Sequence, residues 1–490
     1  MRGTSTLGLP SHLTALAALL FIAPLGLAAQ TQTPSASQND PAEVVRRLMD
    51  EEVARGEAYS MLQELCTGLP HRLSGSEDAA NAEAWALKRM RAAGLQNVRL
   101  EECTVPHWVR GRIARLGVVT PAEAKLAPLP ILALGGSIAT PPGGLRGRVV
   151  VVRSWDELKT RAAEARGAIL LLDRPMDPTE HDPFEAYGKA VDQRGRGAVE
   201  GAKVGAKAVL VRSMTLRLDD FPHTGAMHYD DGVTKIPAAA ISTAGAERLA
   251  ALVRAHAAVE VELELDCKEL PDVTAHNVVG EIVGRERPDE FVVVGGHLDA
   301  WDVGEGAHDD GAGCVQAIEA LRLVRALGPV PRRSLRCVLW MNEENGLRGA
   351  RAYKAAHAAE LDRHVLTIES DRGGFAPRGF GTNAAGAAWD ALAGIAALLA
   401  PGGAGTLEHG GGGADTSPLE AAGGNVMELL PDPARYFDYH PSARDTVDQV
   451  HPRELALGAG ALASLAWCVA ELPDALPRPT PAATPPPASK

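Results

Sequence analysis

The stretch FVVVGGHLDAWDVGEGAHDDGAG (291–313) decides the fold class of this chain. It opens with the apolar run 291–294, stops at His297, and passes through a loop rich in glycine and acidic residues. The following segment, 311–327, repeats apolar residues on one helical face. A strand, a loop with metal-compatible side chains and a helix in this order predict an α/β fold with a largely parallel, helix-covered sheet.

Two further segments repeat this arrangement. In RCVLWMNEENG (336–346) an apolar run ends at Glu343 and Glu344, and in VLTIESDRGG (365–374) another ends shortly before Asp371. In an open α/β sheet, side chains beyond the carboxyl ends of the strands share one edge, so we expect these groups to converge with the imidazole of the first segment. Imidazole and carboxylates gathered in one place indicate a divalent metal site and hydrolytic chemistry.

The residue types also indicate roles. His297 offers an imidazole ligand, and the carboxylate of Asp299 is placed to hydrogen-bond the far ring nitrogen and fix its tautomer. Asp309 lies in a glycine-rich loop that folds tightly enough for its carboxylate to bridge two cations. Of the adjacent Glu343 and Glu344, one can bind metal while the other serves as a general base.

Length and charge bound the class of protein. A chain of 490 residues is longer than a single hydrophobic core usually supports, so we expect two domains or three. The net charge of −13 argues against nucleic acid as a partner, because nucleic-acid binding requires a basic face. No basic run indicates attraction to an anionic membrane surface.

The amino terminus resembles an export signal. Arg2 precedes an apolar core at 13–23, which Pro24 interrupts before it is long enough to span a bilayer. We therefore predict a signal peptide at 1–29, followed by a flexible leader at 30–41, and a secreted or periplasmic protein with no membrane span after the signal is removed.

The amino-acid composition and the pattern of predicted elements change twice along the chain. Residues 42–110 are predicted to form the first part of a catalytic domain, with one helix over 41–65. Residues 111–262 contain short strands, glycine and proline turns and short helices, without a cluster of histidines and carboxylates, which indicates a non-catalytic inserted module. Residues 263–472 carry the catalytic motifs, and the Pro-rich tail 473–490 is predicted to be disordered.

Six cysteines are scattered along the chain, at Cys66, Cys103, Cys267, Cys314, Cys337 and Cys468. The number is even and export would expose them to oxidation, so disulfides are open, but the spacing does not identify pairs. Because no CxxC pair occurs, a cysteine-rich zinc site is not supported.

These motifs resemble the co-catalytic zinc peptidases of the M28 family, most closely its carboxypeptidase Q-like branch. The resemblance covers about residues 42–472. The segments that carry it are GGHLDAWDVGEGAHDDGAG (295–313), NEENGLRGARAY (342–353), ESDRGGF (369–375), HRLSGS (71–76), FPHTGAMHYDDGVTKIPAAAIS (221–242) and GGADTSPL (412–419). The resemblance implies a phosphorylase/hydrolase-like peptidase domain with a mostly parallel central sheet, and an inserted, β-rich protease-associated domain.

The resemblance also implies the site. His297 and Asp371 would bind one zinc, Asp309 would bridge two, Glu344 would bind the other, and Glu343 would be the general base. The expected activity is hydrolysis of short peptides, most plausibly dipeptides with free termini, by an exported enzyme that forms a homodimer.

One ligand position departs from the family pattern. The family has a zinc-binding histidine four residues before an Asp-Thr pair, and here that position holds Pro441, which has no donor atom. Three outcomes are open: His440 substitutes, the second site binds zinc weakly through Asp309 and Glu344, or activity is lost. His451 is a more distant candidate.

Two alternative functions follow. A catalytically weakened or inactive binding homologue is favoured by Pro441 and disfavoured by the intact Glu343, since binding alone has no use for a general base. A different zinc reaction on the same fold, such as amide hydrolysis of a non-peptide or acyl transfer, depends on the shape of the pocket.

Overall fold

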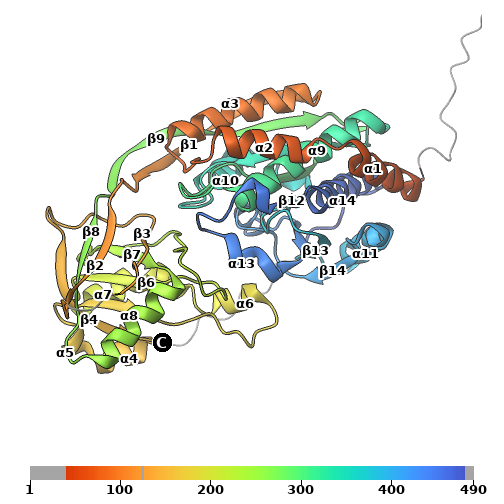
Figure 1. Cartoon of the computed structure of the whole chain (residues 1–490). Coiled ribbons are helices and arrows are strands. Elements are labelled where there is room, and N and C mark those ends of the chain that lie inside the picture. The colour runs from red at the N-terminus through yellow and green to blue at the C-terminus, as the bar shows by residue number, and fades with distance from the viewer. Residues whose placement is uncertain (1–39, 123–125, 480–490) are drawn as a thin grey trace, which may run out of the picture.

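A computed structural model describes residues 40–122 and 126–479. The predicted signal peptide, nearly all of the leader and the end of the predicted tail lie outside the described residues. The described chain forms two parts, each built on its own sheet, with eight strands in the larger part and seven in the smaller (Figure 1).

The larger sheet carries the predicted ligand segments. Its strand order is β1 (Gln96–Val109), β9 (Lys268–Ile282), β11 (Arg333–Trp340), β10 (Arg287–His297), β12 (His364–Glu369), β15 (Val426–Pro431), β13 (Pro377–Thr382) and β14 (Thr406–His409). The run from β11 through β10 and β12 to β15 is parallel, as is the pair β13–β14, whereas β1–β9, β9–β11 and β13–β15 are antiparallel. The sheet is therefore mixed, and its parallel centre contains the strands that lead to His297, Glu344 and Asp371.

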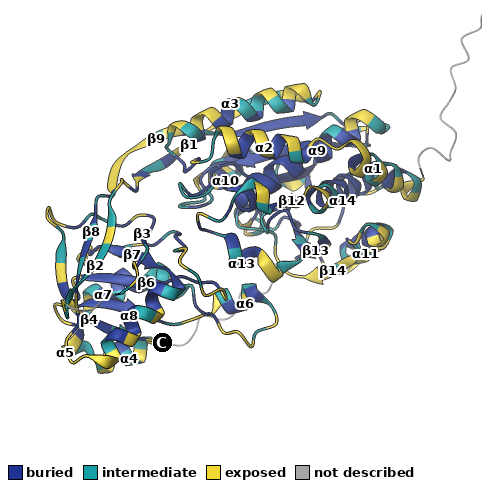
Figure 2. Cartoon of the chain, in the orientation of Figure 1, coloured by how far each residue is buried: buried dark blue, intermediate teal, exposed yellow. Residues whose placement is uncertain are grey.

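Helices cover both faces of this sheet, and the most apolar of them form its core. They are α1 (Pro41–Arg55), α2 (Ala58–Gly68), α3 (Glu77–Ala92), α9 (Ala312–Leu327), α10 (Arg348–Ala356), α11 (Ala387–Leu399) and α14 (Pro452–Glu471). Helix α9 is buried along nearly its whole length, whereas α3 exposes its outer face (Figure 2). The single helix predicted over 41–65 is interrupted, and the chain forms α1 and α2 instead, because the backbone adopts an extended conformation at Gly56.

Helix α14 alone among the described helices is long and apolar enough to cross a membrane, and 78% of its most apolar 18-residue window is buried against the rest of the chain. Its alanine, glycine and leucine residues allow close packing against α9 and α1. It therefore serves as a core helix of the larger part.

The smaller part inserts between β1 and β9. Its sheet order is β2 (Ala114–Thr120), β8 (Glu260–Leu265), β4 (Leu145–Val152), β5 (Ile169–Leu172), β6 (Ala208–Arg212), β7 (Ala238–Ile241) and β3 (Ile131–Ala133). Its helices are α4 (Trp155–Thr160), α5 (Ala162–Ala165), α6 (Pro183–Gly188), α7 (Asp192–Lys203) and α8 (Thr243–Ala255). The centre from β4 to β7 is parallel, so this part is α/β, and β8 ends three residues beyond the predicted boundary at 262.

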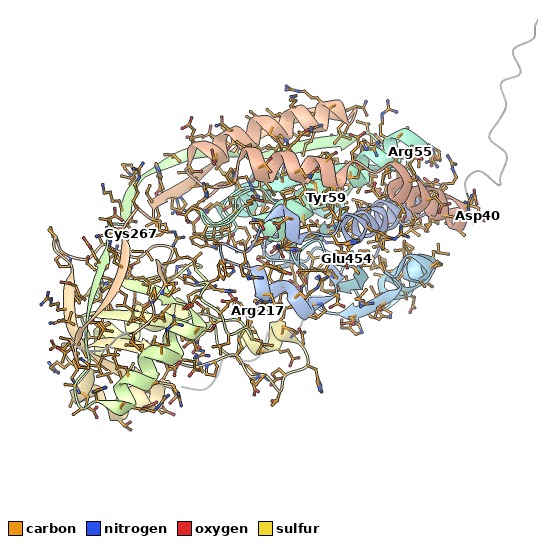
Figure 3. All side chains as sticks on the ribbon, in the orientation of Figure 1. Asp40, Arg55, Tyr59, Arg217, Cys267 and Glu454 are labelled. Carbon is orange, nitrogen blue, oxygen red and sulfur yellow. The ribbon has the colours of Figure 1, made fainter. Side chains whose placement is uncertain are left out.

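The two parts bury side chains against each other. Phe184 of α6 packs on Tyr436 and Phe437 of α13 (Tyr436–Tyr439), with ring centroids 5.2 and 4.8 Å apart. Arg217 of the smaller part, which is labelled in Figure 3, also donates a hydrogen bond to Asp438 at 3.5 Å. These contacts hold the smaller part over the carboxyl edge of the larger sheet.

All six cysteines are free and buried, so they act as small apolar core residues. The start of the predicted disordered tail is packed: Leu476 is buried, and Arg478 donates to the carbonyl of Gly423 at 2.8 Å. The prediction of disorder from 473 onward was wrong for these residues, because apolar and arginine side chains among the prolines find partners.

Candidate metal centre

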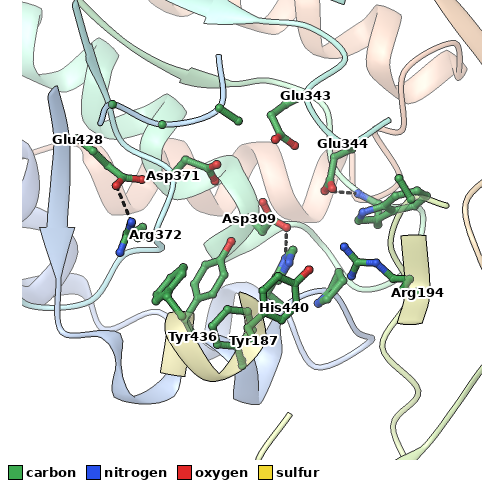
Figure 4. Close-up of a pocket in the computed structure, with 18 residues that line it drawn as sticks. Tyr187, Arg194, Asp309, Glu343, Glu344, Asp371, Arg372, Glu428, Tyr436 and His440 are labelled. Carbon is green, nitrogen blue, oxygen red and sulfur yellow. Dashed lines mark hydrogen bonds and ion pairs between the residues drawn. The ribbon is translucent and has the colours of Figure 1, made fainter. Parts of the chain in front are cut away.

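Each predicted ligand follows an element that fixes its position. His297 is the last residue of β10, Glu344 follows β11, and Asp371 lies two residues beyond β12. Asp309 lies in the short turn Ala307–Gly311 that leads into α9, and His440 directly follows α13. Four of the five line one cavity, with the carboxylate of Glu343 beside them (Figure 4), and His297 lies fully buried next to Asp309.

The side chains approach each other as ligands of a shared ion would. His297 Nε2 lies 3.1 Å from Asp309 Oδ1 and 3.3 Å from Asp371 Oδ1. His440 Nδ1 contacts the other carboxylate oxygen of Asp309, Oδ2. Glu344 Oε1 accepts a hydrogen bond from the backbone N–H of Trp301 at 3.2 Å, which fixes its side chain at the rim of this cluster.

The donor set fits a divalent metal. Asp309 Oδ2, Asp371 Oδ1 and His440 Nδ1 are buried and make no hydrogen bond of normal geometry among the described residues; they face only the other members of this cluster. Buried carboxylates carry a large desolvation cost unless a cation balances them. Imidazole nitrogens with carboxylate oxygens are the ligands that zinc accepts.

Asp310 also lies within ligand distance, since one of its oxygens groups with His297 and Asp371. Both of its oxygens are already used: Oδ2 accepts from the N–H of His297 at 3.0 Å, and Oδ1 from the N–H of Gly313 at 2.9 Å. Asp310 therefore ties β10 to α9, whereas the two oxygens of Asp309 face the imidazoles of His297 and His440.

The position of Asp299 differs from the sequence prediction. The hydrogen bond at His297 Nδ1 goes to the backbone carbonyl of Asp299, at 2.9 Å, and the carboxylate is 3.7 Å away. The carboxylate Oδ1 instead accepts the N–H groups of Asn342 and Glu343, at 2.7 and 3.0 Å. The imidazole tautomer is thus set by backbone, while the carboxylate positions the segment that carries Glu343.

Burial dominates the electrostatics. It raises the pKa of Glu343 to about 8; the positive charge of His297 opposes this, and the negative charge of Asp371 adds to it. Burial also raises the pKa of Glu344 well above its usual value. The cavity contains more carboxyl groups than positively charged side chains. A bound metal ion would supply the missing positive charge and stabilise the ionised carboxylates.

Sequence reasoning missed an anchor of the ligand turn. Asp445 accepts the N–H of His308 at 2.7 Å and that of Asp309 at 3.2 Å, so one carboxylate from a distant loop fixes the turn. His308 itself stacks on Phe375 at 4.1 Å. The only sequence signal for Asp445 was its place in an Asp-Thr pair.

The cavity has a volume of about 460 Å³. Besides the acidic cluster, Tyr436 and Pro441 of the larger part line it, together with Phe184, Tyr187 and Arg194 of the smaller part. Nothing in the sequence marked these last three, because they reach the site only through the docking of the two parts. His451 is exposed at the start of α14 and does not line the cavity.

A buried cluster of imidazole and carboxylates at the carboxyl edge of a mixed α/β sheet is the arrangement of a metallohydrolase. The sequence profile of peptidase family M28 matches residues 277–465. Carboxypeptidase Q from Mus musculus is 37% identical over 443 residues, 90% of this chain and 92% of the relative; the Homo sapiens protein is also 37% identical, over 90% and 91%.

Solved structures agree with this assignment. The crystal structure of a peptidase M28 precursor from Shewanella amazonensis SB2B is similar with a TM-score of 0.86 and 34% identity, covering 90% of this chain and 99% of that one. BSAP, a zinc aminopeptidase from Bacillus subtilis, shares the fold at a TM-score of 0.60 and 20% identity, over 84% and 93%. The chain belongs to peptidase family M28, in its carboxypeptidase Q-like branch, and is a metallopeptidase.

Proposed function

We propose that this chain is an exported, zinc-dependent exopeptidase that hydrolyses short peptides, chiefly dipeptides. The observation that carries the proposal is the convergence of His297 and His440 with the carboxylates Asp309, Glu343, Glu344 and Asp371 at the edge of one cavity. Membership of the carboxypeptidase Q-like branch supports a peptidase that releases residues from a chain end.

Two zinc ions are proposed for the cluster. His297 and Asp371 would hold one, Glu344 and His440 the other, and Asp309 would be shared between the two sites. The contact of His440 Nδ1 with Asp309 Oδ2 supports His440 as the substitute for the histidine that Pro441 replaces. This contact also favours an active enzyme over an inactive binding homologue.

The residues divide the chemistry between them. When bound, zinc would polarise the scissile carbonyl and lower the pKa of the attacking water. Glu343, whose backbone N–H is held by Asp299, would accept the proton of that water and deliver it to the departing amine. Asp445 would keep the turn of Asp309 in place while substrate binds and leaves.

We propose that the smaller part, predicted at 111–262 and continuing to the end of β8 at Leu265, is a protease-associated insert that limits the size of the substrate. Phe184 and Tyr187 close one side of the cavity, and its volume of about 460 Å³ suits a peptide of a few residues. A folded protein chain would collide with the packing of Phe184 on Tyr436 and Phe437.

The experiment compares wild type with Glu343→Gln. We expect wild type to hydrolyse dipeptides, and Glu343→Gln to retain its zinc while losing roughly 10²- to 10⁴-fold in kcat, because the proton acceptor is removed and the ligands are not. Glu408→Gln, an exposed control on β14, should keep the wild-type rate. Amide or acyl-transfer activity without dipeptide hydrolysis would instead favour a different zinc reaction on this fold.

A further inference from the structure

The backbone at His440 and Pro441 is held by the smaller part of the protein. These two residues directly follow α13, a helix of four residues, which is too short to keep its conformation without tertiary contacts. Two consecutive residues of the smaller part, His223 and Thr224, supply such contacts. Nδ1 of His223 lies 2.8 Å from the carbonyl oxygen of His440, and the N–H of Thr224 donates to the carbonyl of Pro441 at 2.9 Å.

The contact with His440 also defines how His223 is protonated. A carbonyl oxygen only accepts hydrogen bonds, so Nδ1 of His223 must carry the proton and donate it. The other ring nitrogen, Nε2, has no hydrogen-bond partner among the described residues, and the residue is 1% exposed. A buried nitrogen without a partner costs stability, so the stability of the fold alone does not explain why a histidine occupies this position.

Three strands of the smaller sheet anchor this pair of residues. The N–H of His223 donates to Ser213 Oγ at 2.8 Å, and this hydroxyl donates in turn to the carbonyl of Ile241 at 2.8 Å. Ser213 directly follows β6, and Ile241 ends β7. Thr224 Oγ1 donates to the carbonyl of Ala133, the last residue of β3, at 3.2 Å. The position of His223 is therefore fixed relative to the smaller sheet.

His440 thus connects the two parts of the protein. Its backbone carbonyl accepts from the smaller part, whereas its ring nitrogen Nδ1 contacts Asp309 Oδ2 of the larger part (Figure 4). A metal ligand must be held within about 0.5 Å of its productive position. A shift of the backbone at His440 would move its imidazole away from Asp309.

We propose that His223 is a positioning residue of the metal centre, which fixes the backbone of His440 so that the imidazole reaches the zinc site beside Asp309. This inference rests on the function proposed above, and it adds that the smaller part completes the site of one zinc ion. The other ion, proposed to lie between His297 and Asp371, should not depend on His223, because the smaller part provides neither of its ligands.

The experiment titrates zinc into the metal-free protein in competition with a chelating dye and measures the affinity of both sites. We expect His223→Leu to weaken the binding of one zinc ion roughly 10- to 100-fold, as loss of a residue that supports a ligand does, and to leave the other unchanged. His223→Asn should bind both ions as wild type does, because its amide nitrogen occupies the place of Nδ1 relative to Cβ. Arg217→Met is the matched control, since Arg217 also joins the smaller part to α13, but through Asp438.

The rate of hydrolysis provides a second measurement. With His223→Leu, dipeptide hydrolysis should be low when zinc is limiting and should recover as the zinc concentration is raised, because the ligands themselves remain. With Arg217→Met, hydrolysis should depend on the zinc concentration as it does in wild type.

The outcomes separate this inference from the function on which it rests. Wild type that binds a single zinc ion, or His223→Leu that binds both ions as wild type does or weakens both equally, would overturn the positioning role and leave a peptidase possible. Wild type that binds two ions but hydrolyses no dipeptide would contradict the peptidase function, while the zinc affinities would still decide the role of His223. If His223→Leu fails to fold, His223→Gln replaces it, since its amide lies one methylene further out; zinc affinities equal to those of His223→Asn would then overturn the proposal.

Discussion

At the scale of single residues, the site depends on a histidine that lies one position away from where the family places it. Pro441 cannot donate to a metal, yet His440 reaches Asp309 because α13 ends at the preceding residue and turns the imidazole into the cavity. The proposed second metal position would thus depend on a short helix that contacts the smaller part.

We expect His440→Ala to weaken the binding of one zinc ion and to lower the rate of dipeptide hydrolysis. Loss of a residue that only hydrogen-bonds to a ligand weakens metal binding roughly 10- to 100-fold, and loss of a ligand should weaken it more. Metal analysis after dialysis against a zinc buffer measures both ions. His451→Ala serves as the control, because its exposed side chain lies outside the cavity. A His440→Ala protein that keeps two zinc ions and the wild-type rate would remove His440 from the ligand set.

Sequence patterns predicted the residues that a strand end positions and missed those that tertiary packing positions. His297, Glu344 and Asp371 each follow an apolar run, so local order alone placed them at one sheet edge. Arg194 and Asp445 come from loops and helices far along the chain, and no local pattern indicates where such elements meet. The Asp299 carboxylate was given the wrong partner because a backbone carbonyl of the same residue lay nearer.

At the scale of elements, the contact of α1 with α9 buries two carboxyl groups together. Glu52 of α1 is 2% exposed and Glu319 of α9 is fully buried, with Arg322 donating to Glu319 at 2.6 Å. Burial first, and Glu319 next, raises the pKa of Glu52 to about 10, while that of Glu319 is lowered by Arg322. The helix pair therefore holds one proton that the unfolded chain would release.

This proton gives a pH dependence with a definite sign. The pKa of Glu52 is raised in the folded chain, so its contribution to stability is complete below its ordinary pKa of about 4.3 and is lost as pH rises toward 10. Glu52→Gln, which mimics the protonated acid, should remove a slope of at most about 1.4 kcal/mol per pH unit from the free energy of unfolding between pH 5.5 and 8.5.

Urea unfolding at several pH values measures this difference. Glu43→Gln, on the exposed face of the same helix, should leave the slope unchanged. Equal slopes for wild type and Glu52→Gln would show that Glu52 is ionised in the folded protein.

At the scale of the whole molecule, hydrolysis and access to it are divided between two sheets that meet at the cavity. The alternation of strands and helices predicted an α/β sheet after residue 277, but periodicity could not show that antiparallel strands would flank its parallel centre. Nor could it show that β1 and β9 would pair along their length and connect the two parts. Export, the domain boundaries and a homodimer stay predictions.

We expect hydrolysis to require bound metal, and zinc depletion followed by readdition tests this requirement most directly. Chelation should abolish dipeptide hydrolysis in wild type, and stepwise addition of zinc should restore it in parallel with zinc bound, reaching two ions per chain, since the buried acids that metal neutralises remain in place. Full hydrolysis by a chain shown to contain no metal would contradict a metal-dependent mechanism.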